Sequence, residues 1–323
     1  MNQQIVLTGS VAYDYLMTFP GLFRELILPD RLESISLSFL VEDMTRQRGG
    51  VAPNIAYTLA LLGGRPKLMA TVGEDFAEYR AWLEARGVDT SLARVVPGKF
   101  TASFFATTDR SNAQIASFYP GAMAHAAELS FRELDSPPDL AVISPNDPGA
   151  MTAYAAECRD LGIPYLYDPS QQVLRLEGEE IRRDMAGAHF LFVNDYEYGL
   201  IEKKTGLNLE NILTLVHVLV VTRGERGTDI YTDGRKVHVP VYPPERILDP
   251  TGVGDAFRGG FLAGWVRGFP LELCGKMGAL AATYCLEQTG TQNHAYTRQE
   301  FVRRFRQTFD DDGLLDALLE DEE

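Results

Sequence analysis

The chain has 323 residues, of which 45% are hydrophobic and 23% charged, and its formal net charge at pH 7 is −15. This composition is that of a globular protein with a large core, and the length alone suggests about two domains. The negative charge argues against a nucleic acid or an anionic membrane as partner, because both require basic surface. It does not exclude a phosphorylated ligand, since a local loop of N–H donors can bind phosphate in an acidic protein.

The sequence has no evident targeting or membrane segment. The start lacks a basic region, its apolar run is interrupted at Asp14, and no stretch approaches the roughly 18 apolar residues of a membrane helix. Three cysteines, Cys158, Cys274 and Cys285, show no paired close spacing, so we expect reduced thiols. These features together predict a cytoplasmic protein.

A short apolar strand over residues 5–9 opens the chain and ends at Gly9-Ser10. Asp14 follows a few residues later, where it is either a ligand contact or a turn residue. The alternation of apolar and polar residues over 33–41 predicts a strand with one exposed face.

A glycine pair then precedes a helix, in the stretch Arg48-Gly49-Gly50-Val51-Ala52-Pro53-Asn54. Pro53 suits the first helical turn, and Asn54 on that turn offers both a donor and an acceptor. Gly49 and Gly50 either let a ligand approach the backbone or form a tight turn.

Residues 67–72 and 76–86 are expected to form a strand and a helix, which make an α/β unit. The rhythm then changes, because 100–108 and 114–119 are β-rich segments joined by a polar turn, which predicts a hairpin. With nearby segments this hairpin would build a small lid from about 10–20, 32–46 and 97–121. Its phenylalanines either pack together or lie over a planar ligand; they are Phe104, Phe105 and Phe118.

From residue 139 onward strands and helices alternate again, with strands expected over 140–144, 163–168, 188–193 and 216–222. Polar residues follow several of these strands, at the edge where open α/β sheets bind ligands. Gln171 and Gln172 either read a heterocyclic edge or are solvated loop residues. Asn194 and Glu197 share a face of a helical first turn, where they either organise water around Mg²⁺ or cap the helix.

Thr222-Arg223-Gly224-Glu225-Arg226-Gly227 follows the last of these strands, and Asp233-Gly234 predicts a hairpin turn. Helices are expected at about 255–268, 270–287 and 297–308. The tail over 310–323 is expected to be a solvated acidic end with one short amphipathic turn.

The stretch Asp249-Pro250-Thr251-Gly252-Val253-Gly254-Asp255-Ala256-Phe257 carries the clearest chemical signal. Its two glycines precede a helix, where N–H groups without intrahelical partners suit an anion. Asp255 stands beside that position, where a carboxylate is unfavourable unless it has a role such as accepting a proton from an attacking hydroxyl. The alternative is an N-cap aspartate behind a glycine-rich turn.

These motifs together resemble the ribokinase family, also called the PfkB carbohydrate-kinase family, over essentially the whole chain. The resemblance implies one α/β domain over residues 1–323, a three-layer fold with a mainly parallel sheet flanked by helices, and a small β-sheet lid. It also implies ATP-dependent phosphorylation of a primary hydroxyl, in which Asp255 is the base. The N–H groups of the loop would form the anion hole, namely those of Gly252, Val253, Gly254 and Asp255.

The same resemblance assigns the remaining motifs. The sugar would be held by Ser10, Asp14, Gly49, Gly50 and Asn54. The nucleotide would be bound by Asn194, Thr222, Gly224 and Gly227. Mg²⁺ would be served by Glu197 and, through water, by Asn194, and such enzymes often bind a monovalent cation such as K⁺ near the equivalent of Asp249.

Two segments, Gly9 to Asp14 and Asp168 to Gln172, are similar to segments of bacterial, ribokinase-like adenosine kinases. This implies that Phe104 and Phe118 stack on a purine and that Gln171 and Gln172 read its edge. We therefore expect a kinase that converts adenosine to AMP. The alternatives are a kinase for ribose, fructose or a related sugar, and a non-catalytic nucleoside-binding protein. A lid sheet with free edges is compatible with a homodimer formed through the lid.

Overall fold

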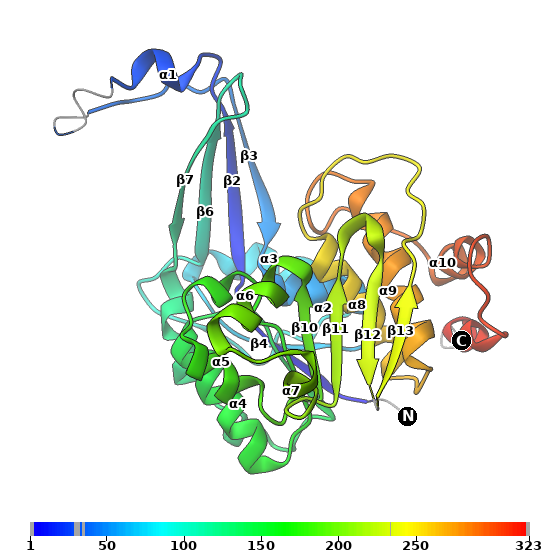
Figure 1. The fold of residues 1–323 in the computed structure, drawn as a ribbon. Coiled ribbons are helices and arrows are strands. Elements are labelled where there is room, and N and C mark those ends of the chain that lie inside the picture. The colour runs from blue at the N-terminus through cyan, green and yellow to red at the C-terminus, as the bar shows by residue number, and fades with distance from the viewer. Residues whose placement is uncertain (1–2, 29–32, 34–35, 233, 321–323) are drawn as a thin grey trace.

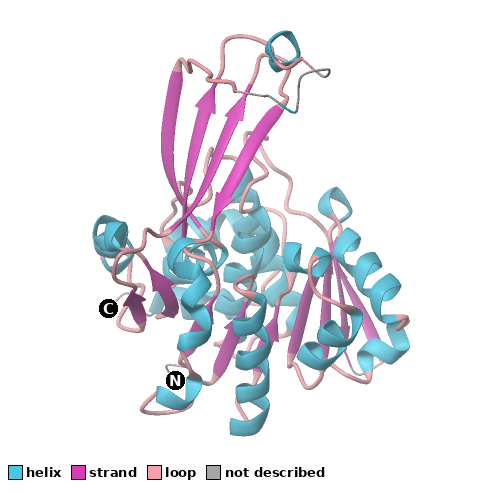
Figure 2. Cartoon of the chain, turned by 90° about the vertical axis from the view of Figure 1, so that its left-hand side faces the viewer, coloured by secondary structure: helices cyan, strands magenta, loops and turns pink. Residues whose placement is uncertain are grey.

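The computed structural model describes residues 3–28, 33, 36–232 and 234–320. Within them, a nine-stranded sheet has the order β13-β12-β11-β10-β9-β8-β1-β4-β5, and a four-stranded sheet has the order β3-β2-β6-β7. Figure 1 shows the small sheet standing out from the body of the molecule, with α1 (Phe23–Leu26) at its far end. Figure 2 shows the same two parts from the side, with most of the helices packed around the large sheet.

The large sheet is parallel from β5 to β11, and β12 and β13 are added antiparallel at one edge. Its direction of winding changes at β1, which pairs with β4 on one side and with β8 on the other. Open α/β sheets bind ligands at such a switch point, outside the carboxyl ends of the strands. The strands are β1 (Ile5–Thr8), β4 (Lys67–Val72), β5 (Ala93–Val95), β8 (Leu140–Ile143), β9 (Tyr165–Tyr167), β10 (Phe190–Asn194), β11 (Val218–Thr222), β12 (Thr228–Thr232) and β13 (Arg235–Val239).

Two hydrophobic clusters cover the two faces of this sheet, because successive strand residues point to opposite sides. In β10, Phe190 and Phe192 belong to one cluster and Leu191 and Val193 to the other. The first cluster contains residues of α2 (Val51–Leu61), α3 (Ala77–Glu84), α8 (Val253–Trp265), α9 (Leu271–Leu286), α10 (Arg298–Phe305) and α11 (Ala317–Glu320). The second contains residues of α4 (Pro148–Leu161), α5 (Gly178–Met185), α6 (Asp195–Thr205) and α7 (Leu209–Leu213).

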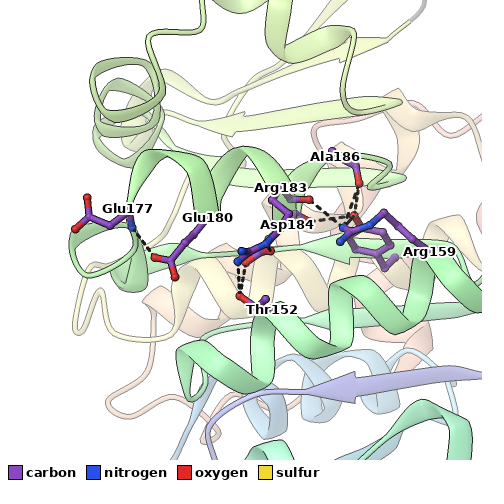
Figure 3. A network of polar contacts seen from close by, with 8 residues as sticks. Thr152, Arg159, Glu177, Glu180, Arg183, Asp184 and Ala186 are labelled. Carbon is purple, nitrogen blue, oxygen red and sulfur yellow. Dashed lines mark hydrogen bonds and ion pairs between the residues drawn. The ribbon is translucent and has the colours of Figure 1, made fainter.

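Polar contacts hold α4 against α5 in the outer layer (Figure 3). Thr152 Oγ1 donates to Asp184 Oδ2 at 2.7 Å, and the Arg183 guanidinium pairs with Asp184 Oδ1 at 2.9 Å. Arg159 Nη1 donates to the carbonyl oxygen of Arg183 at 3.0 Å. Both oxygens of the buried Asp184 carboxylate therefore have partners that join α4 and α5. This carboxylate has a structural role and is not part of the glycine motifs.

The small sheet, which we call the lid sheet, consists of β2 (Ala12–Thr18), β3 (Asp43–Gly49), β6 (Ala102–Thr108) and β7 (Gln114–Tyr119). The predicted hairpin is confirmed, since β6 and β7 pair antiparallel. Strand β2 follows β1 directly, so the lid sheet begins at the ligand edge of the large sheet.

The strand predicted over residues 33–41 is wrong. Residues 36–42 are not in a strand, and 34–35 lie outside the described residues. The strand is instead Asp43–Gly49, an exposed edge strand whose backbone pairing with β2 needs no apolar alternation. The apolar residues before it serve packing, since the Phe39 ring lies 5.2 Å from that of Phe19 and 5.0 Å from that of Phe23.

The other predicted elements from residue 140 onward occur within a few residues of their expected ends. Asp233 of the predicted hairpin turn and residues 321–323 of the acidic tail lie outside the described part of the chain. In the described ranges, no helix combines the length and the apolar character needed to cross a bilayer.

Candidate active site

Loops from the carboxyl ends of neighbouring strands meet at the switch point. After β1, Ser10 N donates to the carbonyl oxygen of Pro145, which follows β8, at 2.8 Å. Ser10 Oγ accepts from Val51 N at the start of α2, at 3.1 Å. Gly50 closes this junction with a φ of 97°, and a Cβ there would lie 2.4 Å from the Ser10 carbonyl oxygen. Glycine is thus required where α2 meets the loop after β1.

The glycine loop at the start of α8 presents unpaired backbone donors. Gly252 precedes the helix in the left-handed conformation, and Ala256 N begins the helical ladder by donating to Gly252 O at 2.9 Å. Val253 N is turned toward Pro250 O at 3.4 Å. The N–H groups of Gly252, Gly254 and Asp255 have no acceptor among the described residues. Three free donors at a helix N-terminus make a site suited to an anion.

Asp255 lies on the first turn of α8 and contacts Asn54 across the site. Asn54 Nδ2 donates to Asp255 Oδ2 at 2.8 Å, and Asn54 itself is only 4% exposed. Burial raises the pKa of the Asp255 carboxyl to about 6, and Glu197 nearby adds to the rise. Arg258 and the Asn54 hydrogen bond act in the opposite direction by favouring the ionised form. The carboxylate is ionised at neutral pH and can accept a proton.

One row of the lid sheet brings a carboxylate next to two aromatic rings. Asp14 pairs with Phe104, and Phe104 pairs with Phe118, so the three side chains lie side by side on one face of the sheet. Burial raises the pKa of the Asp14 carboxyl to about 6. The opposite face packs at its base on α3, where the ring centres of Tyr13 and Tyr79 are 5.5 Å apart.

Gly49 and Asp14 are also neighbours, because a Cβ at Gly49 would lie 2.6 Å from Asp14 Oδ2. The predicted sugar-binding residues therefore come together at the base of the lid sheet.

The two glutamines after β9 have different surroundings. Gln172 is buried, and its Nε2 donates to the Asn146 carbonyl oxygen at 2.8 Å. Gln171 is exposed, and its Oε1 accepts from Ser170 Oγ at 2.9 Å. The predicted pair thus does not present two parallel side chains, and only Gln171 faces solvent.

Asn194 and Glu197 form a reciprocal cap at the start of α6. Asn194 Oδ1 accepts from Glu197 N, and Glu197 Oε2 accepts from Asn194 N, both at 2.8 Å. Glu197 is nevertheless buried, at 8% exposure, rather than a surface residue. The predicted helix cap is therefore confirmed. The same contacts hold the Glu197 carboxylate close enough to Asp255 to raise the pKa of that residue.

An apolar cavity of about 400 Å³ adjoins the glycine loop. It contains the predicted nucleotide residues Thr222, Gly224 and Gly227, and it reaches Gly254 of the loop. The other walls come from segments that carry no local motif and that the sequence did not reveal, including Pro240, Val241, Tyr242, Ile247, Ala279 and Leu286. A cavity of this size and character, open to the anion site, can hold a planar base.

Two further site residues were missed from sequence. Arg258, on the second turn of α8, pairs with Asp168 at the end of β9, and its Nη1 donates to the Gly254 carbonyl oxygen at 2.9 Å. Burial raises the pKa of the Asp168 carboxyl to about 7, whereas Arg258 acts to lower it. The signal that could have found this pair is an arginine one turn after the predicted base, on a helix face that is otherwise apolar.

A mainly parallel α/β sheet, a helix N-terminus with free N–H donors and a lid sheet beside it define an α/β protein with a site suited to an anion at the switch point of its large sheet. The family model described as "pfkB family carbohydrate kinase" matches residues 9–298. The chain therefore belongs to the pfkB family of carbohydrate kinases, and its fold is ribokinase-like.

Several nucleoside kinases are similar to this chain over three quarters of its length or more. The Burkholderia thailandensis nucleoside kinase, solved in complex with inosine, is 38% identical, with a TM-score of 0.84 over 94% of this chain and 98% of that chain. The nucleoside kinase of Methanocaldococcus jannaschii is 27% identical over 94% of this chain and 96% of its own length. The cytidine kinase of Thermococcus kodakarensis is 30% identical over 75% of this chain and 88% of its own length.

Proposed function

We propose that this chain is an ATP-dependent kinase that phosphorylates the 5′-hydroxyl of a nucleoside, with adenosine as the preferred acceptor. The observation that carries the proposal is the row of Asp14, Phe104 and Phe118 on one face of the lid sheet. A carboxylate there can accept hydrogen bonds from sugar hydroxyls, and the two rings can stack on a base. A free sugar offers no flat face to stack on. The inosine bound by the Burkholderia thailandensis enzyme supports a purine nucleoside.

In this proposal Asp255 accepts the proton of the 5′-hydroxyl as that oxygen attacks the γ-phosphorus, and the bond from the γ-phosphorus to the β–γ bridging oxygen breaks so that ADP leaves. Phosphoryl transfer depends mainly on positioning and on stabilisation of charge at the transferred group. The free N–H groups of Gly252, Gly254 and Asp255 supply that stabilisation, with Val253 N close by. Asn54 orients the base, and the lid sheet excludes water that would compete as nucleophile.

The nucleotide would lie in the apolar cavity, with its phosphates toward the glycine loop. Thr222, Gly224 and Gly227 line that cavity together with Gly254. One ligand can therefore contact both the segment after β11 and the glycine loop. Structures of related proteins support ATP as the donor, since the Burkholderia thailandensis enzyme was also solved in complex with ADP-inosine. Gln171, the exposed glutamine, would contact the acceptor base, whereas Gln172 would support its loop through Asn146.

The charges of the site fit a divalent cation such as Mg²⁺. Asp168, Asp255 and Glu197 supply three carboxylates against the single guanidinium of Arg258, which leaves a charge of −2 when all are ionised. In the described ranges no three His, Cys, Asp or Glu residues cluster as a metal cage. Mg²⁺ commonly binds through water and substrate phosphates. A cation bound in this way stabilises the negative charge of the transferred phosphoryl group. Glu197, with Asn194 through water, would serve it here.

Asp249 would border a site for a monovalent cation such as K⁺. Its two carboxylate oxygens accept from Thr251 N and Gly290 N, both at 2.9 Å. Although burial acts to raise it, these hydrogen bonds hold the pKa of Asp249 below its ordinary value. The ionised Asp249 carboxylate thus joins the glycine loop to the loop at Gly290. A cation bound there would stabilise the conformation of both loops.

The lid sheet would pair with that of a second copy. Its face opposite to Phe118 exposes apolar side chains, namely Met44, Phe105, Ile115 and Tyr119. An exposed apolar face with free strand edges is typical of an interaction surface. Sedimentation velocity would test this, because Phe105→Asp should then convert a dimer to a monomer.

A panel of acceptors with ATP and Mg²⁺ tests the proposed reaction. We expect turnover with adenosine and inosine and none with free ribose or fructose. ATP consumption with free sugars but not with adenosine would instead establish a sugar kinase. Binding of adenosine without any turnover would establish a non-catalytic nucleoside-binding protein.

The base assignment has its own test in Asp255→Asn. Loss of a general base typically costs about 10²- to 10⁴-fold in rate. Turnover within about tenfold of wild type, roughly 1.4 kcal/mol in barrier, would refute the role of Asp255.

A further inference from the structure

Gln292 is a buried side chain that touches the proposed base only through another residue. It is 4% exposed and follows α9 in the loop that leads to α10. Its Nε2 lies 2.7 Å from Asn54 Oδ1 and 2.5 Å from the hydroxyl oxygen of Tyr79. Asn54 in turn donates to Asp255. None of the motifs recognised in the sequence includes Gln292 or Tyr79.

The Gly49 carbonyl oxygen fixes which group donates in each hydrogen bond of the series from Tyr79 through Gln292 to Asn54. The Tyr79 hydroxyl lies 3.0 Å from the Gly49 carbonyl oxygen, which can only accept, so the tyrosine proton points there. The tyrosine oxygen is then an acceptor for Gln292, which must present its NH₂ group. The second N–H of that group points to Asn54 Oδ1, so the Asn54 NH₂ group faces Asp255.

The opposite orientation of the Gln292 amide would be unfavourable. Its Oε1 would then face the Tyr79 oxygen and Asn54 Oδ1, which are both acceptors. If Asn54 turned as well, its Oδ1 would face the Asp255 carboxylate. In the observed orientation Oε1 is buried with no hydrogen-bond partner in the described part of the chain. A buried acceptor without a partner is destabilising. An apolar side chain could fill the same space without that cost, so we infer that the Gln292 amide has a role other than packing.

The loop around Gln292 also contacts the end of the lid sheet. Thr291 Oγ1 donates to the Arg48 carbonyl oxygen at 3.1 Å, and Arg48 precedes Gly49 at the end of β3. Gly290 N donates to Asp249 at the start of the glycine loop. The loop therefore contacts β3, the anion loop and the Asn54 side chain at once.

We propose that Gln292 is a positioning residue for phosphoryl transfer: it fixes the Asn54 amide with its N–H toward Asp255 and ties that contact to the end of lid strand β3. This role rests on the proposed function of Asp255 as the base. Gln292 is buried against Asn54 and Tyr79 and does not line the apolar cavity, so we expect its removal to lower the rate rather than the affinity for ATP.

The test is a double-mutant cycle of Gln292→Met and Asn54→Ala, with kcat and the two KM values as readouts. Methionine keeps a flexible side chain of similar length and removes the N–H donors. Alone, Gln292→Met should lower kcat about thirtyfold and leave KM for ATP within about twofold. In the Asn54→Ala background the same change should lower kcat by less than about threefold, because the residue through which Gln292 acts is gone.

Equal losses in both backgrounds would overturn the proposal, and so would a kcat of Gln292→Met within threefold of wild type. Asn293→Met is the matched control, since Asn293 is an exposed amide in the same loop whose side chain donates to Thr289 O. It should leave kcat unchanged. If Gln292→Met does not fold, Tyr79→Phe keeps the buried ring and removes the hydroxyl that orients Gln292. It should lower kcat about fivefold, again without effect in the Asn54→Ala background.

Asp255→Asn, measured in parallel, separates the two claims. Loss of turnover in Asp255→Asn with full activity in Gln292→Met refutes the positioning role alone. Turnover in Asp255→Asn within tenfold of wild type refutes the base assignment and the positioning role with it.

Discussion

Arg258 and Asp168 form a buried two-point ion pair between α8 and the end of β9. Arg258 Nη2 lies 2.7 Å from Asp168 Oδ1, and Nε lies 2.6 Å from Oδ2. Arg258 is 6% exposed and Asp168 is fully buried. Because Asp255 lies three residues before Arg258, this pair sets the position of the proposed base relative to the large sheet. Buried pairs of this kind are costly to break from one side.

Arg258→Met should therefore destabilise the protein by about 3 kcal/mol at pH 8.5, measured by urea unfolding. The loss depends on pH, since burial raises the pKa of Asp168 to about 7 in the fold. A carboxyl with a raised pKa favours the fold at low pH, and that contribution is lost as pH rises through its folded pKa. Without Arg258 the pKa of Asp168 in the fold rises further. The free energy of unfolding of the variant therefore continues to fall above pH 7, where that of wild type no longer changes with the ionisation of Asp168. The gap between the two proteins should be smaller at pH 6.

The matched control for that experiment is Arg132→Met. Arg132 pairs with Asp160 at 2.6 Å, but both side chains are at least half exposed. We expect a change within about 0.5 kcal/mol at either pH. A similar loss for both variants would mean that the buried pair has no special role.

The acid limb of the pH profile should report the ionisation of Asp255. Burial raises its pKa to about 6, so kcat/KM for the acceptor should fall as pH drops below about 6 rather than below about 4. Only the ionised carboxylate accepts a proton. Asn54→Ala removes a hydrogen bond that favours the ionised form, so it should move the limb to higher pH.

Asp14 is the control for that profile, because burial raises its pKa to about 6 as well. Asp14→Asn should raise KM for the acceptor and leave the acid limb of kcat/KM in place. A limb that disappears in Asp14→Asn would assign the titration to the lid carboxylate instead of the base.

Gly252→Ala should impair the glycine loop. Gly252 has a φ of 77°, and a Cβ there would lie 2.8 Å from the Thr291 side chain. Gly268 has a φ of 73° with no atom within 4 Å of such a Cβ, so Gly268→Ala is a matched control. Gly268→Ala should lose about 1 kcal/mol of stability from its positive φ alone, and Gly252→Ala should lose more because of the added contact with Thr291. Only Gly252→Ala should lose turnover, by about a hundredfold. Equal turnover of the two variants would show that the loop geometry is not catalytic.

Phe118→Ala should weaken binding of a purine nucleoside. Loss of a stacking ring should raise KM for adenosine about tenfold, or ~1.4 kcal/mol, with kcat within twofold. Phe105→Ala is the control, because Phe105 lies on the other face of the lid sheet, where its ring stacks on Tyr15 at 4.8 Å. Equal effects on KM would indicate that the rings act through stability of the lid sheet and not by contact with the base.

Local patterns were sufficient for the elements and for the motifs that follow strand ends. Continuous apolar runs and the hairpin turn signal gave the strands of the large sheet to within a few residues, because strands buried on both faces carry their own signal. The exception is the short edge strand β5 (Ala93–Val95), which was not predicted. The strand predicted at 33–41 was wrong because β3 is an exposed edge strand, whose position depends on its partner β2 and not on its own side chains.

The sequence by itself determined which groups this protein has for its chemistry: an acid behind a glycine loop, a Gly-Gly/Asn turn and a capping Asn/Glu pair. Those features are local, because unpaired N–H groups and helix caps depend on a few adjacent residues. Only the tertiary structure decided how they act together. The contacts of Asn54 with Asp255 and Gln292, and of Arg258 with Asp168, span from 90 to 238 positions of the chain. Such contacts arise from the strand order of the large sheet, and no local pattern encodes them.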